Sequence, residues 1–480
     1  MDVNLTAILP EVLLTIALCA VLTLDLFLPQ RRKWLAMPLS FVGVAATLAA
    51  VFNLAGARYV TLGGMFVVDR FAIVFKVIFC VAALIVFVIS HDYLKGDEIH
   101  QGEYYFLILS SLLGMMTIAS SRDLIAIFVS LELISIPTFV LAGIRKSDLK
   151  SNEAGLKFFL FGVLSSALML FGMSLVYGIT GSTNLATISR VLPGIEQDSL
   201  VILAIFFVIV GFGFKISAFP FHWWVPDTYE GSPVPVAAFL SVASKSAGFV
   251  ALLQLMFLGF GGLADVWRPF LGLVAALTMT FGNLVALYQR HIIRLLAYSS
   301  IAQAGYVLIP LGVASSTDSE LNNQIFFAAL TYLLIYVFME TGAFASAIAF
   351  ARRGGGYMIS DYGGLFSRGA PLAVAMTIFL LSLAGMIPLG GFWAKFFVFR
   401  ALIDGQGVWL AIVMAVNTVV SLFYYTAVVK RMFFDEAEDR RPVEVTGPLA
   451  ATLALTAAIV VAIGVNPDFF GQLAARAMPF

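Results

Sequence analysis

The chain has 480 residues, of which 61% are hydrophobic and only 12% are charged, and its mean hydropathy is +0.99. Soluble domains carry about 25% charged residues, so this composition excludes an ordinary soluble domain. The net charge is zero, which excludes the strongly basic surface typical of nucleic-acid-binding proteins. Two cysteines, Cys19 and Cys80, cannot supply the four thiolates of an iron–sulfur cluster, and the four histidines show no haem or zinc spacing. We therefore expect no metal, redox cofactor or nucleic acid on this chain.

Fourteen apolar runs follow one another along the sequence, most of them long enough to cross about 30 Å of hydrocarbon as a helix. The pattern predicts an all-α polytopic membrane protein with about 14 transmembrane helices. The fourth and fifth runs have the least distinct boundary, because only the tetrapeptide SSRD separates them. The expected helices cover residues 7–27, 36–55, 68–90, 104–120, 122–144, 155–178, 200–221, 232–260, 269–288, 295–313, 324–350, 371–399, 407–430 and 448–468.

The charges of the loops predict an orientation. No Lys or Arg precedes the first run, which favours a retained helix over a cleaved signal peptide. One set of alternate loops contains 16 Lys and Arg residues, whereas the other set, together with the C-terminal tail, contains 7. By the positive-inside rule, the richer set faces the cytoplasm. We expect a multi-pass protein of the bacterial cell inner membrane with both termini on the periplasmic side.

Two of the runs contain helix breakers beside a lysine. In the seventh run, Pro220 follows Lys215 and interrupts the helix ladder just after it. In the twelfth run, Pro388 frees the carbonyl of Ala384, upstream of Lys395. Both runs are therefore predicted to form broken helices, which membrane proteins tolerate where the irregular backbone faces protein or water.

The two broken helices lie five runs apart, an odd offset that inverts the topology. This spacing predicts two inverted five-helix repeats, an arrangement in which paired interrupted helices indicate a transport site. We interpret residues 1–480 as a single membrane domain, with three N-terminal helices in 1–103. The first repeat covers 104–260, the second covers 269–430, and 448–480 holds the last helix and the tail.

Several charged side chains lie inside the apolar runs. A charged group at the bilayer centre costs about 2.5–3.5 kcal/mol even on a lenient scale, so such groups usually face a protein interior and mark an ion or proton path. Desolvation favours the neutral form of an amine, so a buried lysine can take up and release a proton. The alternatives are static ion pairs or, near the ends of the runs, side chains that reach the interface. The candidates for a proton path are Glu132, Lys157, Lys215, Lys245 and Lys395.

The surroundings of these groups leave some roles open. His222 follows the first break and could relay protons near neutral pH, or could lie at the interface beside Trp223. Glu340 and Lys76 also lie inside apolar runs, but the sequence assigns no role to either. Three serines flank Lys245 and could order water beside its ammonium: Ser241, Ser244 and Ser246.

Four segments of this sequence carry a resemblance to a known family. They are PFHWWVPDTYEGSPVPVAAFLSVASK (220–245), SLELISIPTF (130–139), RLLAYSSIAQAGY (294–306) and SLAGMIPLGGFWAKF (382–396). They resemble the antiporter-like membrane subunits of respiratory complex I, a family related to Mrp-type antiporters, and the wording at 220–233 is most similar to the subunits called N. The resemblance implies a proton channel built from two inverted half-channels.

The resemblance also implies roles for single residues. Glu132 and Lys215 would form the input-side pair, Lys245 the central carrier and Lys395 the output-side group, while Lys157 matches a further lysine of these subunits. The sequence departs from the pattern at Gln303, where relatives often have a histidine. Glu340 has no counterpart in the pattern.

The resemblance further implies a translocase whose redox chemistry occurs elsewhere. FMN, iron–sulfur clusters and quinone would be carried by partner subunits. This chain would contact neighbouring antiporter-like and small helical subunits, the lipid bilayer and protons. Two alternatives remain: a subunit of an Mrp-type sodium/proton antiporter, and a purely structural membrane subunit with static ion pairs.

Overall fold

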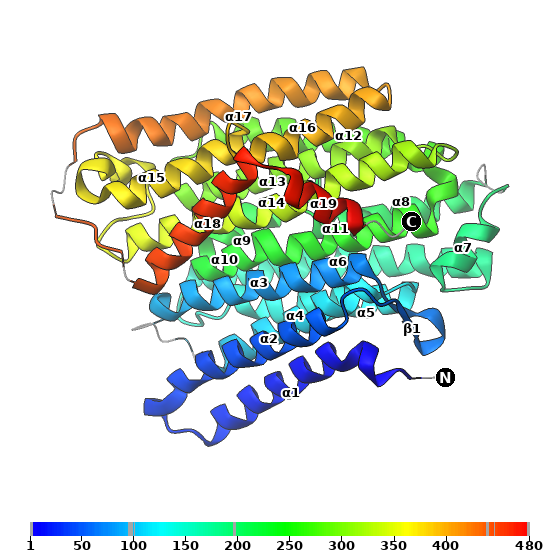
Figure 1. Ribbon diagram of the computed structural model, residues 1–480, viewed down its shortest axis with the longest axis horizontal. Coiled ribbons are helices and arrows are strands. Elements are labelled where there is room, and N and C mark those ends of the chain that lie inside the picture. Colours follow the sequence, from blue (N-terminus) through cyan, green and yellow to red (C-terminus); the bar gives the residue numbers. More distant parts are fainter. Residues whose placement is uncertain are drawn as a thin grey trace.

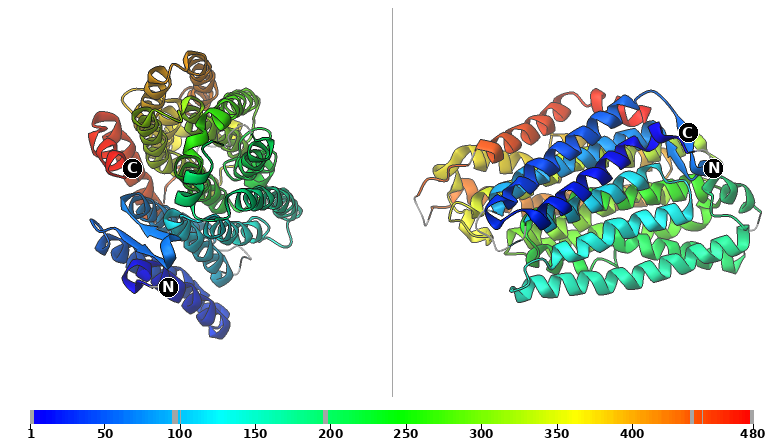
Figure 2. Two further views of the ribbon diagram at one scale, coloured as in Figure 1. Left: turned by 90° about the vertical axis from the view of Figure 1, so that its right-hand side faces the viewer. Right: turned by 90° about the horizontal axis from the view of Figure 1, so that it is seen from below.

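The computed structural model describes residues 3–94, 99, 101–194, 198–437, 441–445 and 447–477. Its long helices run roughly parallel to one another (Figure 1), and both chain ends lie toward the same end of the bundle. Seen along the helices, the first two helices lie at the periphery (left view of Figure 2). Thirteen helices in the described residues are long and apolar enough to cross a membrane. This architecture confirms the all-α polytopic class.

The N-terminal part consists of three long helices and a short hairpin. Helix α1 (Leu5–Phe27) is followed by the 3-10 turn η1 (Gln30–Leu35) and by α2 (Ala36–Asn53). Strands β1 (Tyr59–Thr61) and β2 (Phe66–Val68) pair antiparallel, with Val60 opposite Val67. Helix α3 (Arg70–Tyr93) is capped by Asp69, whose side chain accepts a hydrogen bond from the backbone N–H of Ala72. A carboxylate is a favoured N-cap because it satisfies an otherwise unpaired N–H.

The next helices begin at similar caps. Asp123 caps α5 (Leu124–Ala142) and Asp198 caps α8 (Ser199–Lys215). The SSRD tetrapeptide therefore separates two helices, as the sequence predicts. The elements of this part are α4 (Gln101–Ser120), α5 (Leu124–Ala142), α6 (Leu149–Thr180), α7 (Leu185–Val191), α8 (Ser199–Lys215) and α9 (Trp224–Gly231).

The eighth apolar run forms a composite helix. It consists of α10 (Val234–Phe239), the π-helical turn η3 (Leu240–Ser244), α11 (Lys245–Gln254) and a second π-helical turn, η4 (Leu255–Gly259). The sequence predicts one regular helix here, and the π-helical turns that bracket Lys245 are not evident from the residue pattern. Such turns widen the helix locally and are frequent at functional sites.

The second half continues as a helical bundle. After α12 (Ala264–Ala286), α13 (Ile292–Leu308) runs into the 3-10 turn η6 (Ile309–Val313), and α14 (Ser319–Ala351) follows. The composite helix and α14 form the core, because their most apolar stretches are buried at every position. The remaining helices are α15 (Leu365–Ala384), α16 (Gly390–Asp404), α17 (Val408–Phe434), α18 (Gly447–Val465) and α19 (Asp468–Arg476).

Both predicted breaks are present. Helix α8 ends at Lys215, and the chain runs without regular helix until α9 begins at Trp224. The twelfth run is divided into α15 and α16, which are separated by residues 385–389. Tight packing holds the second break, since a Cβ added at Gly464 would lie 1.8 Å from the carbonyl oxygen of Pro388.

Candidate functional site

Helix α5 places a carboxylate and a hydroxyl near the end of α8. Glu132 and Ser135 lie one turn apart, and residues at this spacing share a helix face. Glu132 is half-buried and accepts a 2.6 Å hydrogen bond from Ser166 of α6. The Lys215 ammonium donates to the Ser135 hydroxyl and interacts electrostatically with Glu132. Glu132 and Lys215 thus share one polar site, but they are not among the direct ion pairs of the described chain.

Helix α11 brings Lys245 to the centre of the bundle. Its side chain is only 2% exposed. The ammonium donates to the carbonyl oxygen and to the hydroxyl of Ser300 on α13, both at 2.9 Å. One turn further on α11, Gly248 packs against α8, and an added Cβ there would lie 3.2 Å from the Cβ of Lys215. The two buried amines therefore lie on helices that contact each other closely.

Lys245 is held by Ser300 rather than by the serines beside it in the sequence. Ser241 bonds other groups, and the hydroxyl of Ser246 has no hydrogen-bond partner among the described residues. Ser300 lies 55 positions away along the chain. Only the tertiary packing of α11 on α13 brings the two side chains together, so the sequence pattern carried no signal for this contact.

Lys395 occupies the second break. Its side chain is 6% exposed, so it does not extend into solvent at the interface. The ammonium donates a 2.9 Å hydrogen bond to the carbonyl oxygen of Ala384, which is the carbonyl that Pro388 was predicted to free. It also lies 4.3 Å from the ring centroid of Tyr306, within the range of a cation–π interaction. The break therefore supplies an acceptor for a buried cation.

Gln303 connects the surroundings of Lys245 and Lys395. Its amide donates to the carbonyl oxygen of Leu383 at 3.0 Å, one residue before Ala384. The same amide nitrogen lies 3.4 Å from the hydroxyl of Tyr425, which in turn bonds Ser299 next to Ser300. The Tyr332 hydroxyl donates to the amide oxygen. Hydrogen-bonding groups thus reach from the Lys245 site to the second break.

The two remaining candidates lie in different surroundings. Lys157 has a 38% exposed side chain and pairs with Asp227 at 2.6 Å and with Glu153 at 2.5 Å, so it belongs to a surface ion cluster. His222 is buried among aromatic rings, with centroids 4.9 Å from Trp223 and 4.5 Å from Phe281. Neither imidazole nitrogen has a hydrogen-bond partner among the described residues. This geometry favours packing beside Trp223 over a proton relay.

The N-terminal helices contain a buried ion pair. Lys76 of α3 is fully buried and lies 2.7 Å from Glu11 of α1. Its ammonium also lies 4.9 Å from the ring centroid of Phe66. From its place near the end of an apolar run, Glu11 is expected at the interface, but it is buried and pairs with Lys76. The pair ties α1 to α3, away from the central row of lysines.

Comparisons with known proteins give the family. Residues 121–421 match the family described as NADH:quinone oxidoreductase/Mrp antiporter, TM. The NADH-quinone oxidoreductase subunit N of Trichlorobacter lovleyi is 40% identical over 480 residues, covering 99% of this chain and 97% of the relative. The protein of the same name from Moorella thermoacetica is 40% identical over 466 residues, covering 97% and 96%.

Solved structures agree with this assignment. A chain of respiratory complex I from Thermus thermophilus with bound aureothin matches with a TM-score of 0.80 and 30% identity, covering 97% of this chain and 99% of that one. A chain of the Mrp complex from Dietzia has a TM-score of 0.87, but at 20% identity it shows a common fold alone. By sequence and structure, this chain belongs to the NADH:quinone oxidoreductase/Mrp antiporter family, within the group of NADH-quinone oxidoreductase subunits N.

Proposed function

We propose that this chain is the proton-translocating, antiporter-like subunit N of an NADH:quinone oxidoreductase. The observation that carries the proposal is the row of buried amines Lys215, Lys245 and Lys395, each placed at an irregular stretch of helix. Three desolvated amines in one bundle are costly for a purely structural subunit. NADH oxidation and quinone reduction, with FMN, iron–sulfur clusters and quinone, occur on partner subunits.

Charge movement starts at the Glu132 and Lys215 site. When these two groups separate, the proton affinity of each changes, because an opposite charge nearby stabilises the ionised form. A proton released by Lys215 passes to Lys245 and onward to Lys395. The hydrogen-bonding groups around Gln303 support the second transfer. Lys157 and His222 have supporting roles only, since one lies in a surface ion cluster and the other among aromatic rings.

The channel halves correspond to the inverted repeats 104–260 and 269–430, each with one broken helix. The basic loops face the cytoplasm, and both termini lie on the periplasmic side of the inner membrane. The position of both chain ends at one end of the bundle supports an even number of crossings (Figure 1). The Mrp-type antiporter subunit is the second candidate, because the description of the matching family also includes Mrp antiporters.

A lysine-to-arginine exchange tests the carrier role of Lys245. Arginine keeps the positive charge but hardly deprotonates, so Lys245→Arg is expected to impair NADH-driven proton uptake by vesicles containing the whole complex. Lys146→Arg, at an exposed lysine, is the matched control. Assembly and electron transfer to quinone are measured in the same preparation. Wild-type proton uptake by the Lys245→Arg complex would show that Lys245 is a fixed charge.

A further inference from the structure

Glu340 lies at the centre of the bundle and has no role in the proposed path. It belongs to α14, one of the two fully buried spans, and its side chain is 0% exposed. Burying an ionised carboxylate is costly unless other groups compensate its charge and its hydrogen bonds. Its neighbours should therefore indicate why a carboxylate is present at this depth.

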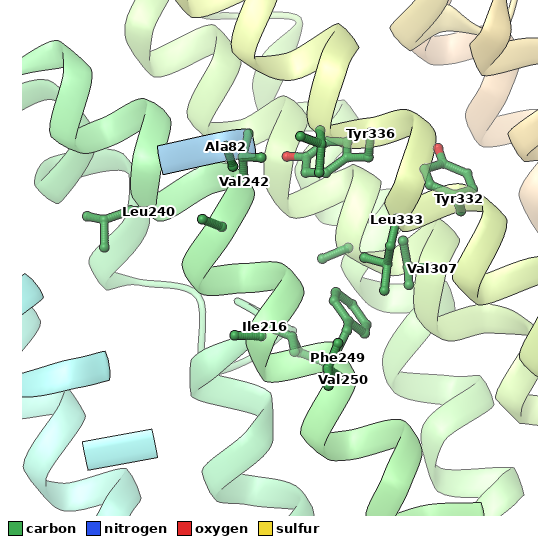
Figure 3. Packing of buried hydrophobic residues seen from close by; sticks show 14 of the residues in the cluster. Ala82, Ile216, Leu240, Val242, Phe249, Val250, Val307, Tyr332, Leu333 and Tyr336 are labelled. Carbon is green, nitrogen blue, oxygen red and sulfur yellow. The ribbon is translucent and has the colours of Figure 1, made fainter. Parts of the chain in front are cut away.

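The contacts of Glu340 come from the π-helical turn η3. Its Oε1 accepts a 3.0 Å hydrogen bond from the Ser241 hydroxyl, which lies one turn before Lys245. The Tyr336 hydroxyl is 3.1 Å from the same serine oxygen. Figure 3 shows the Tyr336 ring extending from α14 toward Val242 of this turn. The other carboxylate oxygen, Oε2, is buried and has no hydrogen-bond partner among the described residues.

Hydroxyl groups lie between Glu340 and Lys245. At one end, the Lys245 ammonium donates to the Ser300 hydroxyl at 2.9 Å. At the other end, Ser241 donates to Glu340. The Tyr229 hydroxyl lies beside both serines without forming a hydrogen bond of regular geometry with either. The carboxylate and the ammonium interact electrostatically, but they are not among the direct ion pairs of the described residues.

Charge balance explains why such a pair suits a proton carrier. A lone Lys245 cation in a dry core carries the full desolvation cost. With Glu340 nearby, the ammonium–carboxylate form and the amine–carboxylic acid form have the same total charge of zero. Exchange between these two forms therefore requires no net charge to enter or leave the low-dielectric core. A proton can also arrive at Lys245 while Glu340 is ionised, which neutralises the site.

We propose that Glu340 is a proton-exchanging partner of Lys245, an inference that rests on the proposed proton path. In the exchange, the Lys245 ammonium gives a proton to the Ser300 oxygen and becomes a neutral amine. The Ser300 hydroxyl turns from the Ala297 carbonyl, to which it now donates, and passes its own proton to Tyr229. Tyr229 passes its proton to Ser241, and Ser241 passes its proton to Glu340, which becomes a neutral carboxylic acid.

Charge-removing and charge-retaining variants of Glu340 test the proposal in the whole complex. Glu340→Gln removes the ionisable group and keeps an acceptor oxygen for Ser241, whereas Glu340→Asp keeps the carboxylate. Glu320→Gln, at an exposed glutamate in the first turn of the same helix, is the matched control. We expect Glu340→Gln to lose the larger part of wild-type proton uptake at normal assembly, Glu340→Asp to retain part of it, and the control to retain it all.

Infrared difference spectra between the resting and the NADH-reduced complex separate proton exchange from a fixed counter-charge. A group that exchanges protons contributes a C=O band of protonated carboxylic acid, which must vanish in Glu340→Gln and shift in Glu340→Asp. A band unaltered in both variants overturns the proposal. Normal proton uptake by Glu340→Gln also overturns it. If Glu340→Gln takes up protons normally but Lys245→Arg does not, the proposed proton path stands without Glu340. If both variants take up protons normally, the proposed path fails as well.

Discussion

Replacing Gly385 by alanine should displace Lys395 without changing any charge. Gly385 ends α15 with a φ of 90°, a conformation that costs a residue with a Cβ about 1–3 kcal/mol. The added Cβ would lie 2.8 Å from Lys395 Cδ, closer than non-bonded carbons approach each other. The lysine side chain must therefore move, and its 2.9 Å hydrogen bond to the Ala384 carbonyl is lost.

The size of the expected effect follows from the backbone strain at position 385 and from the lost hydrogen bond of Lys395. A hydrogen bond to a charged group contributes about 1.5–3 kcal/mol, so its loss disfavours the Lys395 cation by roughly ten- to a hundredfold. Gly194→Ala is a matched control, because Gly194 has a φ of 97° and no atom within 4 Å of an added Cβ. It carries the backbone strain alone, so the difference between the two variants isolates the effect on Lys395.

The assay compares both variants in vesicles containing the whole complex. NADH-driven proton uptake is measured at equal amounts of assembled complex, together with electron transfer to quinone. We expect Gly385→Ala to pump far less than Gly194→Ala at comparable thermal stability. Equal proton uptake by the two variants would refute the reasoning, because it would mean that the position of the Lys395 ammonium does not matter for transfer.

Two further predictions concern stability. Glu11→Gln leaves the buried Lys76 cation without its partner, which should cost about 3–5 kcal/mol and lower the thermal unfolding temperature of the complex. A combined Glu11→Leu and Lys76→Met variant removes both charges and should recover most of this lost stability. If the combined variant recovers none of it, the buried pair is not the cause of the loss. Burial opposes ionisation of Asp227, yet hydrogen bonds from Lys157 and Arg294 hold the pKa of this carboxyl below its ordinary value. Its contribution to stability is therefore present above the ordinary carboxyl value of about 4 and is lost as the pH falls below it. Asp227→Asn should lower stability at neutral pH and flatten the acid side of a thermal unfolding profile, and an unchanged acid slope would contradict the assignment.

Much of the helical architecture is encoded locally and could be predicted. Apolar runs with Asp residues at their starts indicate helices because both signals act within a few residues of the chain. The positions of proline and glycine predicted both breaks, and they even identified the Ala384 carbonyl as free. Lengths were less predictable: α6 begins at Leu149, before the apolar run starts, because Asp148 caps a polar first turn that lies outside the hydrocarbon pattern.

The site was predictable only in part. The buried lysines stand out in the sequence because charge in an apolar run is rare. Two of their partners do not, since Ser135 and Ser300 are ordinary residues whose importance arises from packing between helices distant in sequence. Glu340 did carry a signal, namely a carboxylate in the middle of an apolar run. The residue pattern does not show the contact between α14 and the turn η3, which brings the Glu340 carboxylate to the Ser241 hydroxyl.

In the proposed path, Gln303 limits how a proton can travel from Lys245 to Lys395. A side-chain amide donates and accepts hydrogen bonds, but it is not a titratable group, so it cannot hold a transferred proton as a histidine can. The hydroxyls of Tyr425 and Tyr332, which both contact Gln303, can exchange protons with their neighbours. Transfer across this stretch therefore has to use hydroxyl groups or water beside the amide, with Gln303 fixing their orientation. In the proposed path, an amide at this position places the protonation steps on Lys245, Glu340 and Lys395, and leaves the stretch between them as a neutral connection.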